Sequence, residues 1–140
     1  MLRKQSSESD PADWFYLAAD RLKVADVVWK SEGTTPSGLE LLQEAAERYL
    51  KGYLLAQGWK LEKTHDLSLL LAQAIKRDPA FAKFQTLADD LTHEFFAQHY
   101  PGADWSELGN DYQTHRHELG ELVLLIETSL PQFFPPPPTN

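Results

Sequence analysis

Residues 39–54 read LELLQEAAERYLKGYL, and this stretch decides the fold class. Its apolar side chains recur every three or four positions, which is the period of one face of an α-helix. On the polar face, Glu47 precedes Lys51 by four residues, the favourable order for an ion pair within a helix. Ser37 and Glu40 have the spacing of a capping box. The stretch therefore predicts one amphipathic helix.

Four further segments show the same helical period, and none shows the alternation that is typical of a strand. These segments are residues 11–32, 64–75, 79–99 and 112–130. Asp10-Pro11 and Asp78-Pro79 are typical helix starts, and we expect a short turn near residues 105–108. The pattern predicts an all-α protein, an antiparallel up-and-down four-helix bundle with an additional short helix.

The two ends of the chain differ from this middle part in composition. Residues 1–10 are polar, and we expect them to be a disordered N-terminus. Residues 131–140 contain four consecutive prolines, which predict an extended, proline-rich tail. Such a tail is also a possible ligand for an aromatic groove on another protein, which would make the chain a scaffold. The bundle is expected to span residues 11–130.

Composition excludes several classes of function. The 140 residues include no cysteine, so disulfides, thiolate metal sites and cysteine nucleophiles are excluded. Glycine-rich phosphate loops are absent, and the histidines lack the H-x-x-x-H spacing of a helical zinc site. No apolar run approaches the roughly 18 residues of a membrane span. We therefore expect a cytoplasmic protein without a cofactor, without a metal and without membrane association.

Charge is distributed unevenly along the chain. The formal net charge is −8, and residues 84–140 hold nine acidic side chains and one basic one, Arg116. No acid stands three or four positions from Arg116, so its partner must come from another helix, another chain or a ligand phosphate. Residues 48–83 hold seven basic and three acidic side chains, so a polyanion would bind there.

Three further features of the helices concern how they pack. Gly52 and Gly120 lie in helix interiors, where glycine is tolerated when another group approaches closely. Phe15, Leu22 and Trp29 form a second apolar stripe on the first helix, which predicts a surface for a second copy of the chain. We expect His115, which falls on an apolar stripe, to be a hydrogen-bonded residue without a chemical role.

Two motifs then resemble a known family. Residues 43–55 read QEAAERYLKGYLL, and residues 63–67 read KTHDL. This combination resembles the HEPN domain (higher eukaryotes and prokaryotes nucleotide-binding), whose members read Q-A-x-E-K-x-L-K, then K-T-H-D-L, and later R-Y-P. Here the last element is His99-Tyr100-Pro101, and the resemblance spans about residues 11–130.

The resemblance implies an all-α bundle, a homodimer, and association with a nucleotidyltransferase in toxin–antitoxin pairs. Many members are metal-independent ribonucleases with an R-x(4–6)-H motif. No arginine of this chain has a histidine at that spacing, because Arg116 is followed directly by His117. We therefore expect a binding module for a nucleotide, RNA or a nucleotidyltransferase. The alternative is a ribonuclease with a rearranged site drawn from Arg116, His117, His99 and His93.

A phosphate would bind best where cations meet a helix start. Arg48, Lys51 and Lys63 precede the helix that opens at Thr64-His65-Asp66, so we predict a nucleotide site at Arg48, Lys51, Lys63 and His65. In the other interpretation, Lys51 pairs with Glu47, and His65 or Asp66 only caps the helix.

Overall fold

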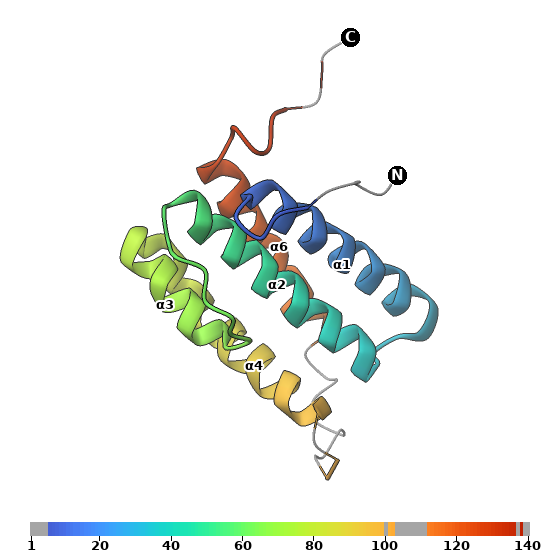
Figure 1. Ribbon diagram of the computed structural model, residues 1–140. Coiled ribbons are helices and arrows are strands. Elements are labelled where there is room, and N and C mark those ends of the chain that lie inside the picture. Colours follow the sequence, from blue (N-terminus) through green and yellow to red (C-terminus); the bar gives the residue numbers. More distant parts are fainter. Residues whose placement is uncertain (1–5, 100, 103–111, 137, 139–140) are drawn as a thin grey trace.

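The computed structural model describes residues 6–99, 101–102, 112–136 and 138. Its helices are α1 (Pro11–Glu32), α2 (Pro36–Ala56), α3 (Leu67–Arg77), the 3₁₀-helix η1 (Pro79–Phe84), α4 (Gln85–His99) and α6 (Tyr112–Ser129). The described residues contain no strand, so the predicted all-α class is confirmed (Figure 1). The turn expected near residues 105–108 lies outside the described residues. In the part of the chain described, no helix is long and apolar enough to cross a membrane.

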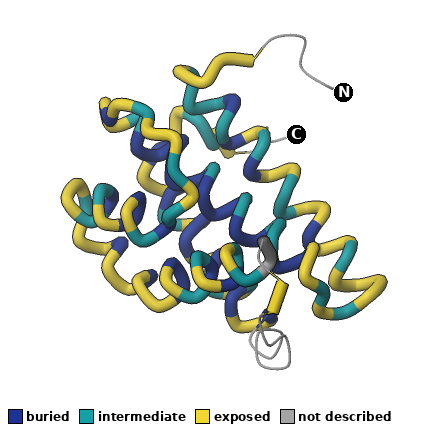
Figure 2. The backbone as a smooth tube through the Cα atoms, turned by 60° about the horizontal axis from the view of Figure 1, so that its bottom comes forward, coloured by how far each residue is buried: buried dark blue, intermediate teal, exposed yellow. Residues whose placement is uncertain are grey.

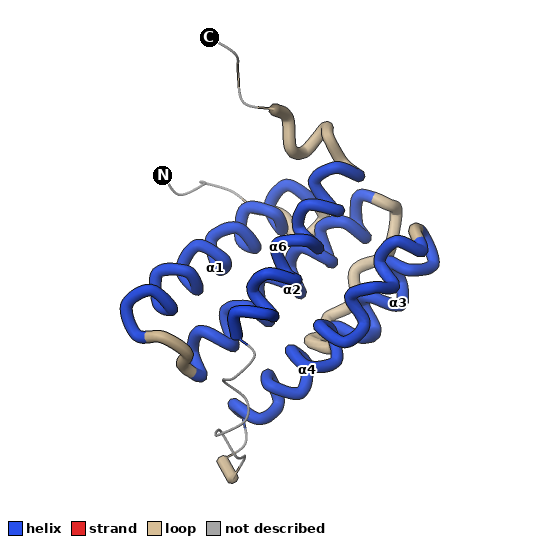
Figure 3. The backbone as a smooth tube through the Cα atoms, turned by 180° about the vertical axis from the view of Figure 1, so that it is seen from behind, coloured by secondary structure: helices blue, strands red, loops and turns tan. Residues whose placement is uncertain are grey.

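Helix α2 is the centre of the molecule. It contacts α1, α3, α4 and α6, and Figures 1 and 3 show it between α1 on one side and the α3–α4 pair on the other. Because other helices surround it, α2 is buried along most of its length (Figure 2). The largest fully buried side chains come from α2, α3, α4, α6 and η1, and include Leu42, Leu50, Leu54, Leu70, Leu71, Phe81, Leu91 and Leu119.

The helix starts are set by short polar side chains. Asp10 caps α1 and accepts a hydrogen bond from the backbone N–H of Ala12, as the sequence predicts. At α2 the structure differs from the predicted capping box, because Thr35 is the cap and accepts from the N–H of Gly38 at 2.9 Å. Pro36 explains the earlier start, since its fixed φ and missing N–H suit the first helical position.

The fourth predicted helix is divided in two. Asp78 caps the 3₁₀-helix η1, and α4 follows directly from Gln85. Phe81 and Phe84 are buried in the core from η1, and Phe81 packs against Tyr53 with ring centroids 4.6 Å apart. The 3₁₀-helix therefore places the ring of Phe81 against α2 and buries Phe84 before the α-helix begins.

Described residues beyond both ends of the bundle contact its helices. The N–H of Ser7 donates to Asp13, and the indole of Trp14 donates to the carbonyl of Glu8, so residues 6–10 are attached to α1. At the other end, residues 131–134 form a turn. The rings of Phe133 and Phe134 pack on Phe15, because burying two aromatic rings outweighs the entropy of a free tail.

The predicted dimer stripe on α1 is wrong for Phe15, which is covered within its own chain. Phe15 is only 6% exposed, since its ring lies against Tyr49, Phe133 and Phe134 within the same chain. A Cβ on Gly52 would lie 2.6 Å from the Phe15 ring, so close approach explains this glycine as predicted.

Candidate functional site

The first of the two sites that we consider is a buried polar network on α2. Glu47 is 4% exposed, and its two carboxylate oxygens accept from Lys51 Nζ at 2.9 Å and bond to His65 Nδ1 at 2.8 Å. Gln43 donates to the same carboxylate and to the backbone carbonyl of His65. The ammonium of Lys51 also lies 5.4 Å from the centre of the Trp14 ring. The network therefore ties α1, α2 and the segment before α3 together.

The charge state of Glu47 follows from these contacts. Burial raises the pKa of Glu47, but hydrogen bonds from Lys51, His65 and Gln43 outweigh burial, and the pKa is lowered overall. Glu47 is therefore ionised at neutral pH and compensates the buried ammonium of Lys51. A buried pair of this kind is costly to break, because removing one partner leaves the other charge without compensation.

The four residues of the predicted nucleotide site do not form an open cation cluster. Lys51 is 4% exposed and paired with Glu47, and Arg48 donates to the carbonyl of Glu44 one turn earlier. Lys63 is exposed, and the His65 ring is exposed while bonded to Glu47. Asp66 caps α3, as the second interpretation of the sequence held. Only Lys63 and His65 thus face solvent to a large extent.

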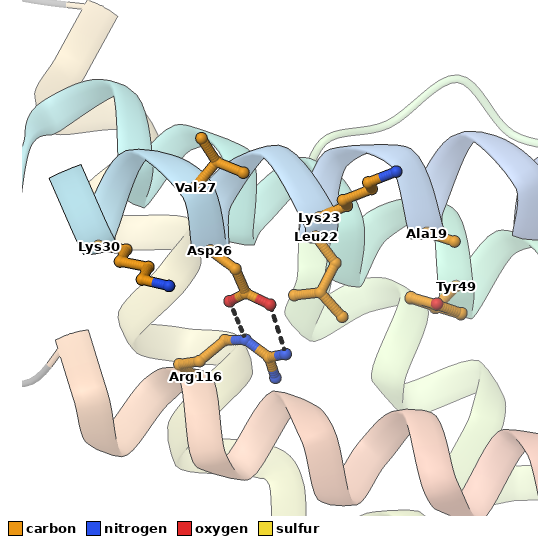
Figure 4. A pocket seen from close by; sticks show the side chains of 8 residues that line it. All are labelled: Ala19, Leu22, Lys23, Asp26, Val27, Lys30, Tyr49 and Arg116. Atoms are coloured by element: carbon orange, nitrogen blue, oxygen red, sulfur yellow. Dashed lines mark hydrogen bonds and ion pairs between the residues drawn. The ribbon is translucent and has the colours of Figure 1, made fainter.

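The second site is a groove between α1 and α6, which we call the α1–α6 groove. It has two lobes with volumes of about 420 and 620 Å³, and both lobes are lined by Asp26, Lys30 and Arg116. The two lobes are further lined by Ala19, Leu22, Lys23, Val27, Trp29, Tyr49, Tyr112, Gln113 and His117. Figure 4 shows Asp26 reaching down from α1 and Arg116 reaching up from α6, with two hydrogen bonds between them.

The larger lobe contains two parallel aromatic rings. Trp29 from α1 and Tyr112 from α6 have ring planes only 2° apart and centroids 6.3 Å apart. The hydroxyl of Tyr112 donates to the carbonyl of Ala25, which fixes α6 against α1. Trp29 remains 36% exposed, so part of this aromatic surface faces the solvent.

The groove carries more positive than negative charge. Among the described residues that line it, Lys23, Lys30 and Arg116 stand against one acid, Asp26. Burial raises the pKa of Tyr49 to about 12 and also raises the pKa of Tyr112, so neither phenol adds negative charge at neutral pH. On a chain with a net charge of −8, this groove is therefore a local cationic site.

Asp26 is the partner that the sequence could not assign to Arg116. Its carboxylate accepts from Nε at 2.7 Å and from Nη2 at 3.0 Å, and donating these hydrogen bonds to Asp26 raises the pKa of the Arg116 guanidinium. The two side chains are 50% and 31% exposed. An ion pair this exposed contributes at most about 1 kcal/mol to stability, so an anionic ligand can compete for it.

The candidate catalytic residues separate into two groups. Arg116 and His117 both line the larger lobe, and His117 bonds to Glu121 at 3.0 Å. His93 is exposed on α4 and does not line the groove. His99 ends α4, but its side chain lies outside the described part of the structure.

His115 is buried and contacts two carboxylates, as the sequence predicts for a hydrogen-bonded residue on an apolar stripe. It is 3% exposed, with Nε2 at 3.3 Å from Asp90 and Nδ1 at 3.5 Å from Glu94, and it joins α6 to α4. Within the described ranges, no group of three or more histidine, aspartate or glutamate side chains is arranged to hold a metal ion.

Sequence reasoning missed the α1–α6 groove as a ligand site. Lys23, Asp26 and Lys30 are spaced three and four residues apart, which places them on one face of α1. This spacing was the available signal. The partner residue Arg116, however, lies 90 positions away from Asp26, so only the fold brings the two helices together.

These observations define an all-α helical domain with a cationic, partly aromatic groove. The family comparison agrees with the fold, because the model of the HEPN domain matches residues 12–123, and the chain belongs to this family. Membership supports a helical module with a nucleotide- or RNA-related function. No curated protein and no solved structure matches the chain.

Proposed function

We propose that the protein is a binding module that holds a nucleotide or RNA phosphate in the α1–α6 groove. One observation carries this proposal: cations from both helices and the partly exposed ring of Trp29, which lies parallel to the buried ring of Tyr112, line the same groove. Aromatic rings stack on nucleobases of any sequence, and lysine and arginine bind phosphate. The groove thus offers both kinds of contact within one site.

The groove is favoured over the cluster at Arg48, Lys51, Lys63 and His65. The ammonium of Lys51 is buried and already compensated by Glu47, so a phosphate would have to enter the core to reach it. By contrast, Lys23 and Lys30 are both exposed on α1. A ligand phosphate can reach them without disturbing the fold.

Reversing the charge of the groove should abolish most of the binding. We expect Lys23→Glu combined with Lys30→Glu to weaken the binding of a labelled single-stranded RNA by about tenfold or more, because phosphate contacts dominate such affinities. Fluorescence anisotropy in EDTA at several salt concentrations measures this loss. The matched control is Lys60→Glu combined with Lys63→Glu, two exposed lysines outside the groove. An equal loss in the control, or binding indifferent to salt, would contradict the proposal.

A metal-independent ribonuclease is the second candidate, because Arg116 and His117 line the same lobe. An imidazole near neutral pH can take a proton from a 2′-hydroxyl and return one to the leaving oxygen, while the guanidinium stabilises the phosphate. In this case mixed RNA is cleaved in EDTA, and His117→Ala removes cleavage while RNA binding persists. Intact RNA after prolonged incubation with the wild-type protein would eliminate this candidate.

We further propose a cytoplasmic homodimer with a nucleotidyltransferase-like partner in a toxin–antitoxin pair; family membership supports these proposals. Since Phe15 is covered within the chain, we assign the contact with a second copy to two exposed aliphatic side chains of α1, Val24 and Val27. Light scattering should give a dimer mass for the wild type and a monomer mass for Val24→Glu. A wild-type monomer at micromolar concentration would refute the dimer.

A further inference from the structure

The carboxylate of Asp26 stands where an anionic ligand of Arg116 would bind. It occupies the guanidinium fork through two hydrogen bonds, to Nε and to Nη2. A phosphate presents paired oxygens to the same fork in the same planar geometry. The side chain from α1 is therefore an internal substitute for a ligand phosphate.

The pair also lies where the two lobes of the groove meet. Asp26 and Arg116 line both lobes, and Figure 4 shows their side chains meeting across the space between α1 and α6. While the two side chains are bonded, a ligand in one lobe meets the paired carboxylate at the boundary with the other. Separation of the pair would free two guanidinium donors, Nε and Nη2.

A released Asp26 has other partners on its own helix. Lys23 stands three residues before it and Lys30 four residues after it, and both lie on the groove face of α1. An acid followed by a lysine at i+4 is the favourable order for an ion pair on a helix. The carboxylate can thus exchange Arg116 for Lys30 without remaining unpaired, which makes its displacement by a ligand inexpensive.

We propose that Asp26 sets the anion affinity of the groove by competing with the ligand phosphate for Arg116. This inference rests on the proposed function. The ligand phosphate, from either a free nucleotide or an RNA backbone, replaces the carboxylate in the guanidinium fork. Asp26 then turns toward Lys30, and the base occupies the lobe that contains Trp29.

Asp26→Asn tests this competition, because it removes the negative charge and keeps a side chain of the same shape. We expect the affinity for a labelled single-stranded RNA to rise about fivefold to tenfold, since a neutral amide holds the guanidinium of Arg116 less strongly than the carboxylate and leaves its two donors to the ligand phosphate. The matched control is Asp20→Asn, the same change at an exposed position of α1 outside the groove. This control should alter the affinity by less than about twofold, because the charge of Asp20 lies outside the groove and salt screens its effect on the ligand.

The gain must also depend on Arg116. In the Arg116→Ala background, Asp26→Asn should give no gain, whereas two independent effects would add. Thermal melting by circular dichroism confirms folding of each variant, and Asp26→Ser is the second variant if Asp26→Asn unfolds. Adenosine monophosphate and the RNA are titrated separately, and the one whose affinity rises is the source of the phosphate.

Two failures are distinguishable in this design. If the double variant Lys23→Glu and Lys30→Glu binds RNA as tightly as the wild type does, the proposed function itself fails. If that double variant loses binding but Asp26→Asn binds no better than the wild type, the groove binds RNA and the competition by Asp26 is refuted.

Discussion

Lys51→Ala should lower the free energy of unfolding by about 3–5 kcal/mol, the loss typical of breaking a buried ion pair. The variant leaves the carboxylate of Glu47 buried without the ammonium that compensates it. It also removes the contact between that ammonium and the Trp14 ring. Urea unfolding at neutral pH, followed by circular dichroism, measures the loss.

The control for this prediction is Lys63→Ala. Lys63 is exposed and belongs to the same basic segment, so its removal should change the free energy of unfolding by less than about 0.5 kcal/mol. Equal stability of the Lys51 and Lys63 variants would show that the buried pair contributes nothing specific. A further check is RNA binding, which Lys51→Ala should leave intact at temperatures where the variant is folded.

The same network predicts how stability depends on pH. Because the folded pKa of Glu47 lies below its ordinary value of 4.5, the contribution of this carboxylate is fully present above about pH 4.5. It is lost as the pH falls through the lowered folded pKa. Glu47→Gln should therefore be less stable than the wild type at pH 7, and the difference should shrink in acid. A constant difference from pH 7 to pH 3 would contradict this assignment.

The second large effect concerns Gly52. Gly52→Ala should lower the free energy of unfolding by about 2 kcal/mol, although alanine is favoured over glycine inside a helix by about 1 kcal/mol. The added Cβ would lie 2.6 Å from a carbon of the Phe15 ring. That ring cannot withdraw freely, because Tyr49, Phe133 and Phe134 pack around it.

Gly120→Ala is the matched control, since it makes the same change in the interior of α6. A Cβ there meets only Nη1 of Arg116, at 3.4 Å, and a flexible guanidinium can move by a few tenths of an ångström. We expect this variant to keep or gain stability, by up to about 1 kcal/mol. In a double-mutant cycle, Phe15→Leu should recover part of the loss at Gly52. Equal effects at the two glycines would refute the steric explanation.

Local signals predicted much of the fold. Asp10-Pro11 opens α1, and the period of residues 39–54 matches the buried face of α2. The predictions failed where distant residues decide the structure. Phe133 and Phe134 lie beside a run of prolines, and nothing in that segment indicates that Phe15 receives their rings.

At the two sites, too, local signals predicted only part of what the fold brings together. Charge counted along the chain drew attention to Lys51 and Lys63, but it could not show that Lys51 is buried with Glu47. The expectation that Arg116 pairs with a group from elsewhere was correct, and the fold supplied Asp26. The stacking of Trp29 on Tyr112 has no local signal in the sequence, because Tyr112 lies on a helix far along the chain.

The central claim is that the ligand enters the α1–α6 groove, and a nuclear magnetic resonance titration tests it most directly. Single-stranded RNA is added to the ¹⁵N-labelled wild-type protein, and the indole N–H signals of its tryptophans are followed. We predict that the signal of Trp29 shifts, together with the backbone signals of Lys30 and Arg116, while the signal of the core residue Trp59 stays unchanged. Shifts at Lys63 and His65 with an unchanged Trp29 would contradict the account.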